Sequence, residues 1–129
     1  MFAKVGLGQL SAITIINIKN DSLIGINKNE KAPEFPGGNK EINKFINKHM
    51  LYPQRAKEEG IEGKCYMSFI VDTTGEVCEV KLIKGLKNCE ECDRDAIRLT
   101  KIMPRWKPYL VDGKKQRCKI IYTINFRMI

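Results

Sequence analysis

The sequence has few of the residues on which enzymes depend. Its 129 residues include one histidine, His49, and no carboxylates paired at helical spacing on an apolar face. It also has no phosphate-binding loop, because Gly37-Gly38 lacks the preceding strand and the following Lys and Ser/Thr of such a loop. These absences argue against acid–base and nucleotide chemistry. We therefore predict that the protein is not an enzyme and needs no cofactor.

Long apolar runs are also missing. A membrane-spanning helix needs roughly 20 predominantly apolar residues, with about 18 as a practical lower limit. Residues 5–18 come closest, but glycine and polar residues interrupt them. No membrane span is predicted.

Cysteine occurs five times, an odd number, without the repeated spacing of a metal site. Only one pair has the C-x-x-C form, and a zinc site usually needs two such pairs. Structural thiols are the favoured interpretation, a local disulfide within the C-x-x-C pair stays open, and no metal site is predicted. The cysteines are Cys65, Cys78, Cys89, Cys92 and Cys118.

Acidic residues are outnumbered, with 23 Lys and Arg against 15 Asp and Glu, which gives a net charge of +8. On charge alone, nucleic acid, anionic lipid and acidic protein surfaces are all plausible partners. The charge is spread along the chain, however, and no aromatic residues alternate with basic ones to form a stacking platform for bases. A solvated surface is the favoured interpretation, and no nucleic-acid partner is expected.

Two segments have helical periodicity. We predict helices near residues 39–49 and 93–103, with Asn39 and Asp93 as their N-caps, because such side chains accept the N–H groups of a first turn. Pro104 follows the second helix and prevents its extension.

Three segments alternate as strands do. We predict strands at 64–72, 76–83 and 117–127, with a bulge near residues 78–79 in the second. A right-handed crossover from the second strand through the second helix places the third strand beside the first. The predicted fold is therefore α+β, with α-β-β-α-β topology, a three-stranded antiparallel sheet of order 2-1-3 and both helices on one face.

This topology restricts disulfide pairing. Cys65 and Cys118 should lie at opposite ends of neighbouring strands and Cys78 on the far strand, beyond the Cα separation of roughly 4.4–6.8 Å that a disulfide needs. Only Cys89 and Cys92 remain as a pair that can bridge.

Motifs between residues 35 and 108 occur in a fixed order. Phe-Pro-Gly-Gly should form an extended arm that packs onto the domain, Tyr-Pro should end the first helix, and a glycine should allow the hairpin loop. The structural residues of these motifs are Phe35, Pro36, Gly37, Gly38, Tyr52, Pro53, Gly60, Gly63, Gly75, Asp93, Pro104, Trp106 and Pro108.

Together, in this order, these motifs resemble the C-terminal domain of the TonB energy-transducer family, particularly its Bacteroidetes-type branch. The resemblance covers about residues 33–129. Residues 1–32 are then an N-terminal extension in which the isoleucine-rich run 13–18 can add a strand, followed by a short linker.

The resemblance implies a periplasmic, cell-envelope protein that engages the TonB box and plug of an outer-membrane transporter. In the family, an inner-membrane motor supplies the energy for transport through an N-terminal transmembrane helix and a Pro-rich spacer. The 129 residues contain neither, so motor proteins are expected as partners only if the sequence belongs to a longer chain.

The predicted binding site is the last strand, which the 2-1-3 order leaves on an edge. Lys119 and Arg127 alone would only guard that edge against aggregation. The resemblance instead implies that the strand accepts the TonB box by β-augmentation, while Arg55 and His49 approach the plug. The strand lacks the mid-strand proline of the Bacteroidetes-type pattern. Its partner-binding residues are Cys118, Lys119, Ile120, Ile121, Tyr122, Thr123, Ile124, Asn125 and Phe126.

Two other functions remain open. One is a stand-alone envelope adaptor or sensor-associated domain that uses the same edge for another ligand. The other is a cytoplasmic binder of nucleic acid or membrane surfaces, whose affinity would fall steeply as salt is raised.

Overall fold

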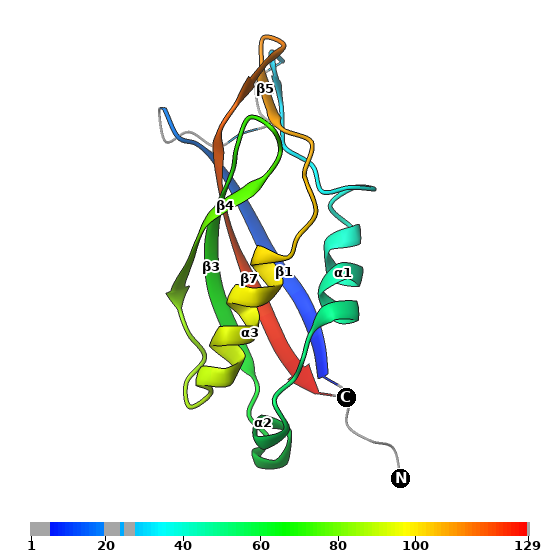
Figure 1. The fold of residues 1–129 in the computed structure, drawn as a ribbon, viewed down its shortest axis with the longest axis vertical. Coiled ribbons are helices and arrows are strands. Elements are labelled where there is room, and N and C mark those ends of the chain that lie inside the picture. Colours follow the sequence, from blue (N-terminus) through cyan, green and yellow to red (C-terminus); the bar gives the residue numbers. More distant parts are fainter. Residues whose placement is uncertain (1–5, 20–23, 25–27, 129) are drawn as a thin grey trace.

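The computed structural model describes residues 6–19, 24 and 28–128, with the backbone alone for residues 6–12. In these residues the fold is α+β, with three helices and two antiparallel sheets (Figure 1). In chain order the elements are β1 (Gly6–Asn17), β2 (Glu30–Lys31), α1 (Glu41–His49), α2 (Gln54–Glu59), β3 (Gly63–Val71), β4 (Val77–Lys84), α3 (Glu90–Lys101), β5 (Tyr109–Val111), β6 (Lys114–Gln116) and β7 (Cys118–Met128).

The main sheet has the order β1-β7-β3-β4. The three predicted strands are β3, β4 and β7, and their predicted order, 2-1-3, is confirmed. The predicted three-stranded sheet with an open third strand is wrong, because β1 pairs antiparallel with β7 from Gly6↔Met128 to Asn17↔Cys118. The prediction built the sheet only from residues after 33 and left the N-terminal strand without a partner.

The predicted helices are present, but their N-terminal caps differ. Residue Lys40 precedes α1 without a side-chain cap, and the Asn39 side chain instead accepts the N–H of Phe35 at 3.0 Å. Residue Cys89 caps α3, so Asp93 falls inside the first turn.

The structure also contains a short helix that the sequence did not indicate. Helix α2 follows Pro53 directly and ends at Gly60, whose φ of 69° lies in the left-handed region. The Tyr-Pro motif therefore separates two helices, α1 and α2.

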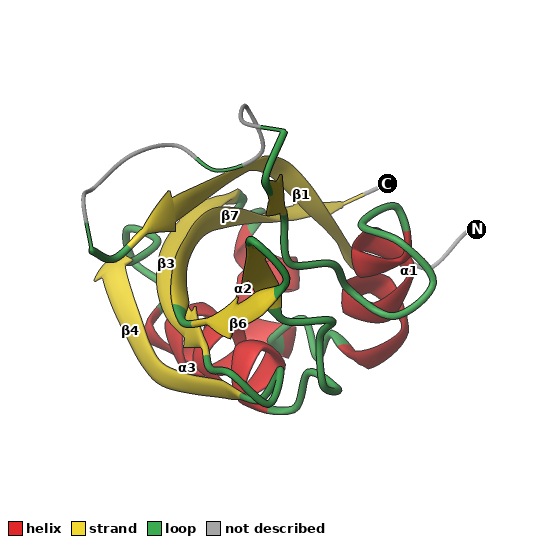
Figure 2. Cartoon of the chain, turned by 90° about the horizontal axis from the view of Figure 1, so that it is seen from above, coloured by secondary structure: helices red, strands yellow, loops and turns green. Residues whose placement is uncertain are grey.

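The core lies between the main sheet and the helices. Figure 2 shows α1, α2 and α3 on the concave side of the curved sheet. Phe35 and Trp106 are 4% and 3% exposed, and their rings meet edge to face at 5.6 Å, as expected for an arm packed onto the domain. Trp106 also donates its backbone N–H to the carbonyl of Gly75 at 2.8 Å, which ties the β3–β4 loop to the core.

A second sheet, of order β2-β5-β6, lies at one end of the molecule and was not predicted from the sequence (Figure 1). Its strands have two or three residues each, which is too short for a periodicity to be read. This sheet carries Tyr109, whose side chain is completely buried. The division of the chain at residue 32 stays a prediction.

Candidate functional site

Strand β7 is long and regular. Its register with β3 runs from Gly63↔Phe126 to Val71↔Cys118 without a shift. Alternate side chains point into the core, and the others lie on the opposite face of the sheet. The buried, core-facing set is Cys118, Ile120, Tyr122, Ile124 and Phe126.

Strand β1 occupies the other side of β7, the side predicted to be open. Ile24 donates its N–H to the carbonyl of Ile15 at 3.1 Å, so the backbone groups of Ile15 face away from β7. Backbone groups alternate in direction along a strand. Thr14 and Ile16 therefore present their N–H and C=O groups to β7, opposite Ile121 and Lys119.

The core-facing side of β1 contributes residues that the sequence did not assign to this site. Ile13 and Ile15 pack against the hydrophobic core. Asn17 is 6% exposed and donates its side-chain amide to the hydroxyl of Tyr109 at 3.0 Å. The alternation of isoleucines indicated a strand, but it carried no information about which strand would pair with it.

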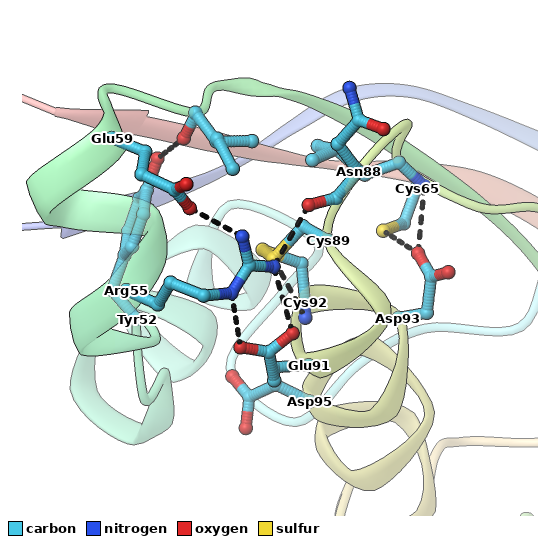
Figure 3. The surroundings of a disulfide bond; sticks show 12 residues. Tyr52, Arg55, Glu59, Cys65, Asn88, Cys89, Glu91, Cys92, Asp93 and Asp95 are labelled. Carbon is cyan, nitrogen blue, oxygen red and sulfur yellow. Dashed lines mark hydrogen bonds and ion pairs between the residues drawn. A yellow bond between two sulfur atoms is a disulfide. The ribbon is translucent and has the colours of Figure 1, made fainter.

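Arg55 lies on α2 and makes several bonds within the molecule (Figure 3). Its guanidinium donates to both carboxylate oxygens of Glu91 at 3.0 Å, to the carbonyl of Asn88 at 2.9 Å and to Glu59. The hydrogen bond from Arg55 lowers the pKa of the Glu91 carboxyl to about 2. The side chain of Arg55 is nevertheless 46% exposed, which leaves one side open to a partner.

His49 ends α1 and is half-buried. Its ring packs against that of Phe45, with centroids 4.6 Å apart, and its carbonyl accepts a hydrogen bond from Arg98 at 2.6 Å. His49 and Arg55 therefore belong to different helices, each held by its own contacts.

Cys89 and Cys92 form a disulfide across the start of α3 (Figure 3). The structural-thiol interpretation is therefore wrong for this pair, and the alternative of a local disulfide is correct. The first turn of α3 already brings the two Cα atoms to 5.2 Å, within the range a disulfide needs. Both residues are completely buried, so the disulfide is screened from solvent.

The other three cysteines are free. Cys65 pairs with Ile124 and Cys118 with Val71, at opposite ends of the β3–β7 ladder, which confirms the predicted separation. Burial raises the pKa of both the Cys65 and the Cys118 thiol to about 12, with a further contribution from Asp93 at Cys65.

In the described part of the chain, no three His, Cys, Asp or Glu side chains gather in a way that would hold a metal ion. The same residues include no helix long and apolar enough to cross a membrane.

The family model described as the Gram-negative bacterial TonB protein C-terminal matches residues 48–128, which run from the end of α1 to the end of β7. No curated protein and no solved structure matches the chain. The matched residues are more than half of the chain and contain α2, β3, β4, α3 and β7, so the protein belongs to the TonB C-terminal domain family.

Proposed function

We propose that the protein binds the TonB box of an outer-membrane transporter by strand addition at β7, and so couples inner-membrane energy to active transport. The TonB C-terminal domain is a non-enzymatic energy-transducer module of the periplasm, and domains of this family bind TonB-dependent outer-membrane transporters. The proposal assigns that contact to a particular strand of this chain.

The observation that supports this assignment is the position of β1. Residues 6–17 lie outside the family match, whereas β7 lies inside it. Within residues 48–128, β7 has a neighbour on one side only, which is β3. The other edge already accepts an extended segment, and it can do so for a peptide through the same main-chain hydrogen bonds.

The partner residues are those of the β7 segment 118–126. The TonB box is expected to run parallel to β7, as the family resemblance implies, although β1 itself runs antiparallel. Either orientation uses the N–H and C=O groups of Lys119 and Ile121. Arg55 and His49 are proposed to approach the plug, Arg55 through its exposed side.

The test is an NMR titration of the full chain with a synthetic peptide from the N-terminal segment of a TonB-dependent transporter. Amide shifts should centre on residues 118–126, and binding should be weak, because the peptide must be ordered on one edge. Ile121→Pro removes an N–H that faces the edge and should abolish binding. Ile121→Val keeps that N–H and is the matched control, expected to bind within about threefold of the original chain because the contacts are main-chain.

Shifts centred on residues 72–80, with β7 silent, would contradict this assignment.

A further inference from the structure

We propose that β1 occupies the partner-binding edge as a built-in ligand, so that its side chains define the class of segment the edge accepts. That class is an extended chain with two aliphatic residues at alternate positions, followed two residues later by a hydrogen-bonding side chain. This inference rests on the proposed function, since it describes the same edge of β7.

The backbone geometry makes β1 and an added peptide mutually exclusive. Thr14 and Ile16 face β7 and take up the main-chain groups of Ile121 and Lys119. An extended segment added to β7 needs the same groups, whichever direction it runs. A partner therefore binds only when β1 leaves.

The first part of the specificity comes from two aliphatic positions. Ile13 lies opposite Tyr122 and Ile15 opposite Ile120, and both β7 residues are buried. The two β1 side chains pack against the core, on the side of the sheet where α1 contacts β1. A replacement strand with polar residues here would leave apolar surface of the core exposed to water.

The second part of the specificity is polar. At the end of β1, Asn17 donates its side-chain amide to the Tyr109 hydroxyl at 3.0 Å and accepts the N–H of Lys19 at 2.9 Å. The Tyr109 side chain is completely buried, and its hydroxyl interacts with the side chains of both Asn17 and Glu30. An amide or hydroxyl at the third inward position of a ligand can take the place of Asn17.

Two features make β1 separable from the rest of the sheet. Its register against β7 shifts between Leu10 and Ile13, which divides the pairing into two short blocks, residues 6–10 and residues 13–17. Strand β1 also lies outside residues 48–128, which match the family model. Within those residues the β3–β7 ladder is unbroken.

The experiment compares a locked chain with a released one. The double variant I16C/K119C places two cysteines at directly paired positions, where Cα atoms of such pairs lie about 5.5 Å apart and a disulfide can form. The double variant T14P/I16P removes two N–H groups that face β7 and releases β1. The original chain with and without reductant is the control, because reductant also acts on Cys89–Cys92.

The probes are a peptide with the sequence of residues 11–19 of this chain and the transporter peptide used above. Affinity for a site that is open only part of the time is reduced by the open fraction. Both peptides should bind the released chain at least about tenfold more tightly than the original chain, and the oxidised locked chain at least about tenfold more weakly. Reduction of the locked chain should restore binding.

Two altered versions of the residue 11–19 peptide test the specificity. The peptide carrying Ile13→Lys and Ile15→Lys should lose binding, whereas the peptide carrying Thr14→Lys should keep it, because position 14 faces away from the helices. Equal binding of these two peptides would overturn the assigned ligand class.

Equal binding of the probes to the locked and released chains would overturn the competition itself. A different result would separate this inference from the proposed function. If the residue 11–19 peptide binds the released chain and the transporter peptide does not, β1 is the occupant of the edge but the transporter is not its partner.

Discussion

The two outer strands that flank the β3–β7 pair, β4 and β1, protect the sheet in different ways. Beyond β3 lies β4, which has an irregular backbone: its register shifts twice against β3, and Glu79 has a φ of 49°. Such a bulged edge with lysines at 81 and 84 discourages another strand. Strand β7 is regular, and it is covered by a whole strand.

The difference favours β7 rather than β4 as the edge for the proposed partner. Strand addition needs a straight row of N–H and C=O groups with a constant spacing. In β4 the regular spacing of backbone groups is interrupted at Glu79, whereas β7 keeps it along its entire pairing with β3. A regular edge needs a cover, and β1 supplies one.

The largest effect is expected on the β4 side, from Gly75→Ala. Gly75 has a φ of 87°, and a Cβ there would run into the carbonyl oxygen of Trp106. The left-handed conformation alone costs roughly 1–2 kcal/mol, and the forced movement of backbone should bring the loss of unfolding free energy to about 3 kcal/mol or more. Urea denaturation would measure it.

Gly113→Ala is the matched control for this substitution. Gly113 has a similar φ of 77°, but nothing lies within 4 Å of the position that a Cβ would take there. Gly113→Ala should lose only the conformational part of the unfolding free energy, about 1–2 kcal/mol. Equal losses of unfolding free energy for Gly75→Ala and Gly113→Ala would show that the clash between the new Cβ and the Trp106 carbonyl oxygen costs nothing.

On the β7 side, Tyr109→Phe should destabilise the protein by about 1–2 kcal/mol. The change removes the hydroxyl that accepts the Asn17 amide and leaves that buried donor without its partner. Tyr66→Phe, at a residue that is 37% exposed, is the control and should change the unfolding free energy by less than about 0.5 kcal/mol. Hydrogen exchange should localise the loss from Tyr109→Phe to β1 and to β2, since the hydroxyl also bonds the Glu30 side chain.

Thiol labelling should compare the two edges directly. Cys78 on β4 is half-buried, whereas Cys118 on β7 is fully buried and burial raises its pKa to about 12. Only the thiolate reacts. Burial raises the pKa of the Cys78 thiol too, but Cys78 is partly accessible to the reagent, so it should label at least about tenfold faster at pH 8. In T14P/I16P the labelling of Cys118 should accelerate, while Cys65, equally buried but on β3, should not. Peptide mass spectrometry would read all three sites.

The same raised pKa values predict a dependence on alkaline pH. The folded protein keeps Cys65 and Cys118 protonated to about pH 12, whereas thiols of the unfolded chain ionise near pH 9.0. The unfolded state therefore binds fewer protons above about pH 9, and the free energy of unfolding should fall as the pH rises from there. A double variant with serine at both positions should lose this part of the pH dependence.

How far the sequence predicted the molecule depends on the range of the interactions. The strands β3, β4 and β7, the bulge at Glu79 and the helices α1 and α3 follow from local periodicity, and the strand order follows from the handedness of one crossover. The pairing of β1 with β7 joins segments about a hundred residues apart, and no local pattern encodes it.

The smaller misses have local causes. Helix α2 has six residues, too few to establish a 3.6-residue period. The expected caps failed because Asn39 and Asp93 bond other groups: Asp93 accepts the N–H of Leu86 at 2.7 Å rather than capping α3. A C-x-x-C pair looks the same in sequence whether it is reduced or oxidised, so the disulfide stayed an alternative.

The smallest effect is expected at an exposed ion pair on β4. Arg117 pairs with Glu79 across the sheet, and the two side chains are 52% and 54% exposed. Exposed ion pairs contribute roughly 0–1 kcal/mol because water and salt screen them. Arg117→Gln should therefore leave the unfolding free energy within about 0.5 kcal/mol of the original chain and leave peptide binding at β7 intact. A loss above about 2 kcal/mol would mean that this exposed pair stabilises the fold more than solvent screening allows.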